Sequence, residues 1–157
     1  MTSDELGDQI RSYIESHNIC HLAVTDGERP SSHTVYYVSS GFRLYFESDP
    51  DSQKIHIIQA NPNVSLTVDE DYADWREIMG VQMFGRARIV DETKAKPVRE
   101  KFMRKFPAID EYGGLPPHHV FVEVIPEKIY FLDFTRGFGH RSLYYPDEKA
   151  GKTRIKW

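Results

Sequence analysis

Three short segments rich in β-branched and aromatic residues follow closely on one another near the start of the chain. They are residues 19–25 (ICHLAVT), 31–39 (SSHTVYYVS) and 43–48 (RLYFES). The connections between them, DGERP and then SG, are typical of tight turns. Because parallel strands need a much longer crossover, we predict an antiparallel meander. This feature directs the chain toward folds built around an antiparallel sheet.

Helices are expected between and around the strands. Apolar residues at helical spacing predict one helix over 3–17 and another over 93–106. A short helix over 52–60 is expected to begin with Asp51 or Ser52 as its cap. Helices in these places would flank the sheet.

Further strands complete the predicted sheet. They cover residues 64–68, 81–90, 120–125 and 128–134. Gly85 lies inside the longest of them, where a glycine suggests a bulge or a close approach of another backbone. Mostly antiparallel strands with intervening helices close most easily into a small barrel, so the fold class is mainly β with flanking helices.

Length and composition exclude several classes of protein. The 157 residues form a single domain, 1–157, with a helical start (1–18) and an irregular, basic tail (136–157). A net charge of −4 disfavours a nucleic-acid binder, and the lone Cys20 excludes a disulfide framework. No apolar run has the roughly 18 residues of a membrane span. The N-terminus also lacks the features of a signal peptide, so a cytoplasmic protein without membrane contact is expected.

Known catalytic and metal-binding motifs are absent from the sequence. There is no phosphate loop, no H-E-x-x-H and no G-x-S-x-G, and a hydrolase triad has no ordering motif. Gly137-Phe138-Gly139 starts a dinucleotide-like pattern, but a serine stands where its third glycine belongs. The adjacent His118 and His119 favour a surface or capping role, because neighbours on a strand face opposite ways. No metal site is therefore predicted.

One local arrangement suggests an anion site. The predicted strand ending in Glu47-Ser48 leads into a short helix opened by Ser52-Gln53-Lys54. A helix start offers unpaired N–H groups and the positive end of its dipole, and a lysine and a hydroxyl lie in the same turn. The arrangement predicts a phosphate seat, although Ser52 as a simple cap and Lys54 as a solvated side chain would also explain it.

The order of these pieces resembles the pyridoxamine-phosphate-oxidase-like flavoproteins, the FMN-binding split barrels. The matching text is HLAVTDGERPSSHTVYYV, RLYFESDPDSQKIHIIQANPNVSLTV and VQMFGRARIV, within about residues 19–90. Its most specific block runs over 44–68. The segments REKFMRKFP (99–107) and RGFGHRSLYY (136–145) are similar to one small, uncharacterised bacterial branch of this superfamily.

The resemblance implies a six-stranded antiparallel split β-barrel that forms a homodimer with FMN between the subunits. The strand His33 to Tyr37 would lie along the flavin ring, with main-chain groups, His33, Thr34 and Val35 at the polar edge of the ring. The ribityl chain would meet 46–48, and the phosphate would meet 52–54. The cofactor contacts implied are His33, Thr34, Val35, Tyr36, Phe46, Glu47, Ser48, Ser52, Gln53, Lys54 and, from the other subunit, Gln82. Part of the segment 136–145 of the other subunit is also expected near the ring.

The function implied is that of a flavoprotein, with an oxidoreductase as the first interpretation. Reduced FMN would pass electrons or hydride to a small oxidised substrate, and His140 and Tyr144 are the candidates for a proton donor. The residues that hold pyridoxal phosphate in the family's oxidases are not recognisable, so vitamin B6 chemistry is not expected.

Two alternatives belong to the same fold. One is a flavin-binding protein without turnover, related to storage, stress sensing or electron relay, and the flavin could also be a deazaflavin. The other is a haem-binding protein. Its axial ligand would come from His17, His21, His33 or His140.

Overall fold

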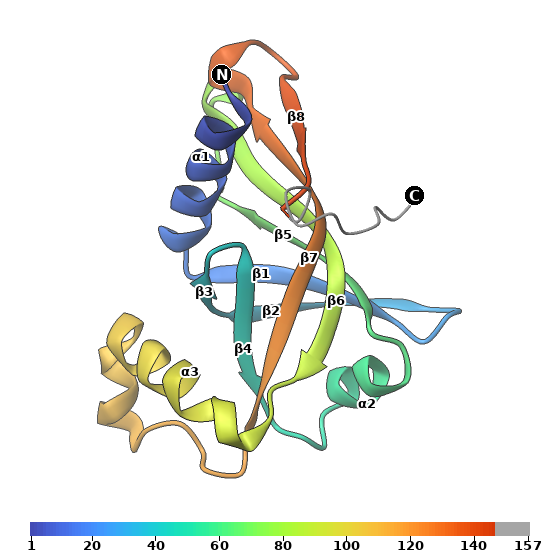
Figure 1. Cartoon of the computed structure of the whole chain (residues 1–157), viewed down its shortest axis with the longest axis vertical. Helices are drawn as coiled ribbons and strands as arrows, with labels where there is room; N and C mark the ends of the chain where they lie inside the picture. Colours follow the sequence, from blue (N-terminus) through green and yellow to red (C-terminus); the bar gives the residue numbers. More distant parts are fainter. Residues whose placement is uncertain (147–157) are drawn as a thin grey trace.

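Eight strands form one antiparallel sheet in the computed structural model, which describes residues 1–146 (Figure 1). The strands are β1 (Ile19–Thr25), β2 (Pro30–Tyr36), β3 (Val38–Ser40), β4 (Arg43–Ser48), β5 (Asn63–Asp69), β6 (Met79–Ile89), β7 (Val120–Asp133) and β8 (Arg141–Tyr144). The helices are α1 (Ser3–Glu15), α2 (Gln53–Ala60) and α3 (Glu92–Lys105), with short 3-10 turns η1 (Trp75–Glu77), η2 (Pro107–Tyr112) and η3 (Phe134–Arg136). The antiparallel, mainly β architecture with flanking helices is confirmed.

The sheet is curled into a split barrel. Its strand order is β2-β1-β5-β6-β7-β4-β3, with β8 beside β7. The two ends of this path, β2 and β3, are consecutive in the chain and separated only by Tyr37. The sheet must therefore curve round on itself, and its opening lies where β2 ends and β3 begins.

The long strand β7 joins two halves of the molecule. Its first part, Val120 to Val124, pairs with β4, and its last part, Ile129 to Leu132, pairs with β8. Between the two parts, the register with β6 shifts between Phe84 and Gly85. A side chain at Gly85 would overlap the carbonyl oxygen of Ile125, so the predicted bulge and close backbone approach are both confirmed.

The count of six strands implied by the resemblance was wrong, and three local differences separate the seven strands predicted from the residues from the eight observed. The expected strand 31–39 divides because Tyr37 leaves the ladder, with its N–H donating to Asn18 O and its buried hydroxyl to Ile14 O. The two expected strands 120–125 and 128–134 are one strand, because it continues through the bulge. The tail is not irregular throughout, since β8 pairs with β7; the rest of it, 147–157, lies outside the described residues.

The core has one large and one small cluster. The large cluster fills the barrel and is covered by α1, whose Ile10 and Ile14 are completely buried. The small cluster lies under α3 and contains Val38, Phe102 and Phe121. None of the helices in the described range has both the length and the apolar character that a bilayer span requires.

Candidate functional site

A cavity of about 900 Å³ lies between the open end of the barrel and the α3–η2 segment. This volume falls within the roughly 300–1,000 Å³ of small-molecule and cofactor sites. The sheet side contributes Thr34, Val35, Tyr36, Glu47 and Ser48, and Asp49, Lys54 and His119 follow from the adjoining segments. Of the residues expected to contact a cofactor, the structure thus brings six together around one cavity.

The opposite wall of the cavity is apolar and comes from α3, η2 and the loop that follows. Its main side chains are Phe102, Phe106, Ile109, Tyr112 and Leu115. The ring of Phe106 meets that of Tyr36 edge to face, with centroids 5.5 Å apart. This pair joins the two walls. A flat apolar group therefore fits between them better than a strongly hydrated one.

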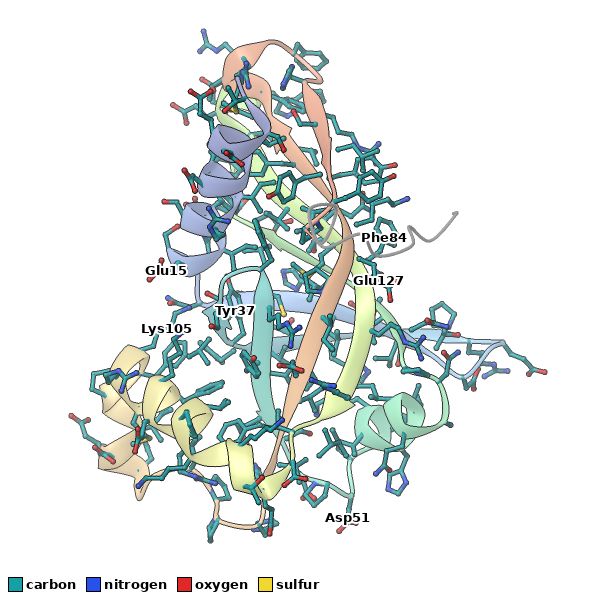
Figure 2. The ribbon with its side chains drawn as sticks, viewed as in Figure 1. Glu15, Tyr37, Asp51, Phe84, Lys105 and Glu127 are labelled. Carbon is teal, nitrogen blue, oxygen red and sulfur yellow. The ribbon has the colours of Figure 1, made fainter. Side chains whose placement is uncertain are left out.

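Lys105 fastens α3 to the sheet. Its ammonium donates hydrogen bonds to Tyr37 O, at 3.1 Å, and to His17 O, and it lies 4.4 Å from the centre of the Tyr37 ring. Figure 2 shows Lys105 at the end of α3, beside Tyr37. Burial lowers the pKa of this lysine. The lysine therefore holds the apolar wall in place next to the split between β2 and β3.

One end of the cavity, formed by the end of β4 and the start of α2, is a candidate anion-binding site. The hydroxyl group of Ser48, which lines the cavity, lies 3.0 Å from that of Ser52. Ser52 is the N-cap residue of α2 and does not itself line the cavity. The Ser52 side chain makes no capping hydrogen bond, which leaves first-turn N–H groups of α2 without that partner. Lys54 follows in the same turn and has no ion-pair partner among residues 1–146. Hydroxyls, N–H groups and an unpaired cation fit a terminal phosphate.

His33 lies close enough to Lys54 for the lysine's charge to affect the imidazole. Partial burial and, secondly, the charge of Lys54 lower its pKa. The imidazole is therefore neutral near pH 7. A hydrogen bond of 3.0 Å joins its Nε2 to the Ser31 hydroxyl.

Carboxylates also line the cavity, at the side nearest β7. Glu47 contacts Nδ1 of His119, and both side chains are largely buried. Asp49 is exposed and accepts the N–H of Asp51 at 2.9 Å, which shapes the turn leading into α2. The contact with His119 fixes the position of the Glu47 carboxylate at this side of the cavity.

The other five predicted cofactor residues lie outside the cavity lining: His33, Phe46, Ser52, Gln53 and Gln82. Phe46 points into the core with 1% of its surface exposed, and Gln53 is exposed on the first turn of α2. Gln82 lies on β6, where its side-chain oxygen accepts from Arg141 at 3.4 Å. Contact between these side chains and a ligand in this cavity would require the ligand to extend beyond it or a second subunit to approach.

The candidate proton donors His140 and Tyr144 also lie apart from the cavity. His140 precedes β8 and its Nε2 lies 3.3 Å from the Ser142 hydroxyl. Tyr144 packs between α1 and the ring of Phe42, at 5.1 Å between centroids. Within one subunit, Tyr144 helps to fix the tail on α1.

The candidate haem ligands differ from the histidine that the cavity presents. Both ring nitrogens of His17 have partners, Tyr13 O at 2.7 Å and Glu70 at 3.0 Å. His21 lies on β1 beside Thr34. Among the seven histidines, all within residues 1–146, the one that lines the cavity is His119.

Reasoning from the sequence missed the apolar wall, Asp49 and His119. The available signals were the predicted helix over 93–106 and the similarity of the segment REKFMRKFP to a bacterial branch of the flavoproteins. Neither could reveal which face of the helix meets β2. That contact joins residues about 70 positions apart, as in the pair Tyr36 and Phe106.

The curled antiparallel sheet, split between consecutive strands, defines a split-barrel domain, and its cavity has the size of a small-molecule site. The family model described as pyridoxamine 5'-phosphate oxidase matches residues 6–133, and the chain belongs to this family.

Two curated relatives span most of the chain. A UPF0306 protein of Cronobacter sakazakii is 26% identical over 145 residues, which cover 91% of this chain and 97% of the relative. General stress protein 26 of Bacillus subtilis is 24% identical over 135 residues, 85% of this chain and 92% of that protein.

Solved structures share the fold. A putative pyridoxamine 5'-phosphate oxidase from Listeria innocua has a TM-score of 0.67 at 21% identity, covering 82% of this chain and 98% of its own. A FAD-binding protein from Mesorhizobium loti has a TM-score of 0.63 at 24% identity, with coverages of 75% and 87%. A haem-binding protein from Mycobacterium smegmatis has a TM-score of 0.77 at 14% identity, with coverages of 98% and 62%. The fold therefore has both flavin-binding and haem-binding members.

Proposed function

We propose that the chain is an FMN-binding flavoprotein that passes electrons or hydride to a small oxidised substrate. The observation that carries the proposal is the cavity, which has a hydroxyl- and lysine-lined end at α2 and an aromatic wall at α3. These two ends match the phosphate and the flat ring of FMN. Membership of the pyridoxamine 5'-phosphate oxidase family and the likeness of the fold to that of a FAD-binding protein support the same choice.

In this proposal, the chain's own residues bind and orient the cofactor. Lys54 and the hydroxyls of Ser48 and Ser52 hold the phosphate, together with N–H groups of the first turn of α2. Thr34, Val35 and Tyr36 lie along the ring edge, and the α3–η2 wall excludes water from its other side. Bound FMN would supply the redox chemistry. The neutral His33 near Lys54 adds no positive charge to the phosphate end.

We further propose that two copies form a homodimer around the cofactors. Gln82 and the segment 136–145 lie away from the cavity of their own subunit, and a partner subunit would bring them to the open side of the ring. A cytoplasmic location is part of the same proposal, in keeping with the single, buried thiol of Cys20.

The phosphate contact can be tested by Lys54→Glu. We expect FMN affinity to fall at least tenfold, equivalent to about 1.4 kcal/mol, because a like charge replaces the cation beside the phosphate. Quenching of flavin fluorescence during titration measures the dissociation constant. Riboflavin, which lacks the phosphate, should bind the wild type and the variant equally.

A matched control is Lys96→Glu, which makes the same charge change on an exposed part of α3. FMN affinity should not change in this control. Equal FMN affinities for wild type and Lys54→Glu would remove Lys54 from the site, and failure of the wild type to bind FMN would overturn the proposal.

Two spectroscopic measurements separate the alternatives. Reduction of the bound flavin by NAD(P)H, followed by its reoxidation with a quinone or nitro compound, would support an enzyme over a flavin carrier. A Soret band formed with haemin by a chain that ignores FMN would favour the haem-binding alternative, with His119 as the histidine that lines the cavity.

A further inference from the structure

Two histidines and two carboxylates gather where β4 ends and β7 begins. Figure 1 shows these two strand ends at the same lower edge of the sheet. The register places Glu47 opposite Phe121 and Ser48 opposite Val120. One step further along the same antiparallel register brings Asp49 across from His119, and Glu47 onto the diagonal. The grouping is therefore a consequence of strand pairing.

The potential ligand atoms of these side chains lie slightly further apart than the ligand atoms of an occupied metal site. Asp49, His118 and His119 each offer one ligand atom, and these atoms lie within 4.8 Å of one another. In a tetrahedral zinc site, bonds of about 2.0–2.2 Å place ligand atoms about 3.4 Å apart. Asp49 and His118 are exposed, so rotation of their side chains can close the difference without moving the backbone.

The adjacent histidines are not restricted by strand geometry. His118 and His119 precede β7, in a turn where the N–H of His119 donates to Pro116 O at 3.1 Å. Their rings lie edge to face, with centroids 4.7 Å apart. Neighbouring residues in a turn can direct both imidazoles to one side, which neighbours on a strand cannot.

Glu47 holds the ring of His119 in place. It contacts Nδ1 of His119, which leaves Nε2 of that ring available as a ligand. Metal-binding histidines commonly have their second nitrogen held by a carboxylate in this way, because it fixes the ring and its tautomer. Asp49 is likewise held, since one of its oxygens accepts the Asp51 N–H and the other is left for a cation.

We propose that Asp49, His118 and His119 bind a divalent first-row transition metal ion of the zinc type, with Glu47 orienting His119. Two imidazoles and a carboxylate suit Zn²⁺, Co²⁺ or Ni²⁺ rather than Mg²⁺ or Ca²⁺. Three protein ligands leave a further coordination position for water or an anion. Because Asp49 and His119 also line the cavity, that position lies at its wall. The inference does not depend on flavin binding.

Calorimetric titration with Zn²⁺ tests the site, using the full chain at pH 7.5 without a polyhistidine tag. We expect one ion per chain in the wild type. Asp49→Asn, His118→Ala and His119→Ala should each weaken binding at least tenfold, since each removes one ligand. The matched control is His56→Ala, which removes an exposed histidine of α2 and should leave the affinity unchanged.

A second arm uses pH and a coloured ion. Imidazole ligands must be neutral, so Zn²⁺ affinity should fall when the pH is lowered from 7.5 to 5.5. Co²⁺ should give visible absorption bands with the wild type and not with His119→Ala. The proposal is overturned if the wild type binds no Zn²⁺, if all three ligand variants keep the affinity of the wild type, or if the affinity of the wild type does not change with pH.

Discussion

Two helices cover the split barrel in different ways, and the difference separates its core from its candidate site. Figure 1 shows α1 beside the upper part of the sheet and α3 beside the lower part. Ile10 and Ile14 of α1 are completely buried in the main core, whereas α3 buries Phe102 in a small second cluster. The cavity of about 900 Å³ lies next to α3. A helix that packs closely stabilises the barrel, and a helix that stands away from it leaves room for a ligand.

The α3 side of the barrel is also more polar than the α1 side. The α1 side is filled by aliphatic and aromatic side chains of the large cluster. The α3 side includes lysine, histidine and carboxylate groups in its cavity lining, and a buried Glu123 nearby that pairs with Arg88 and Arg43. Charged groups at a cavity are available for ligands, whereas in the core they would cost several kcal/mol each unless paired.

The largest expected effect is on the α1 side. Ile14→Ala should reduce the free energy of unfolding by about 2–5 kcal/mol, because it leaves a cavity in a completely filled core. Ile109→Ala at the cavity wall should cost only about 1 kcal/mol, since that side chain is already partly exposed. Urea unfolding of both variants measures the two values. Equal losses would show that the cavity wall at η2 is packed as tightly as α1.

The next effect concerns the bulge where β7 passes from one region to the other. Gly85→Ala should cost about 1–3 kcal/mol, because the added methyl group would overlap the backbone carbonyl of Ile125. Gly80→Ala is the matched control, because Gly80 and Gly85 both lie on β6. Its methyl group would lie 3.4 Å from Val68 O, and a smaller loss is expected in the same urea titration. If the two variants lost the same stability, the close approach at the bulge would not be limiting.

The smallest effect is a pH dependence confined to the α3 side. Burial alone would raise the pKa of Glu123, but hydrogen bonds from Tyr45 and Arg88 and the charges of Arg88 and Arg43 outweigh it and hold the pKa below its usual value. A carboxyl whose pKa is lowered by folding stabilises the protein above its unfolded pKa of 4.5. This contribution is lost as the pH falls through the folded value.

Glu123→Gln should therefore cost about 1 kcal/mol near pH 7, and the difference from the wild type should shrink as the pH falls below 4.5. Urea titrations between neutral and acidic pH measure this change. Glu28→Gln, in the exposed turn between β1 and β2, is the control and should follow the wild type throughout. A difference that stays constant down to low pH would show that the charge of Glu123 is not what stabilises this region.

Much of the local structure could be predicted because its causes are local. The β-branched residues of β1, the aromatic residues of β4 and the tight turns beside them identify these strands. Ser52, one of the two cap residues expected, is the N-cap residue of α2, although its side chain makes no capping hydrogen bond. The bulge at Gly85 was also predictable, since only a residue without a side chain fits there. In contrast, β8 was missed, because a strand of four residues depends on its partner β7 for its existence.

The candidate site was predictable in part for the same reason. The proposed phosphate end at Ser52 and Lys54 is formed by neighbours in the chain, so the sequence alone placed these two residues in one helical turn. The aromatic wall at Phe106 and the meeting of Asp49 with His119 were decided by the tertiary structure. They depend on how α3 docks and on the register between β4 and β7. Docking and register are settled by the packing of the whole chain, which no local pattern of residues encodes.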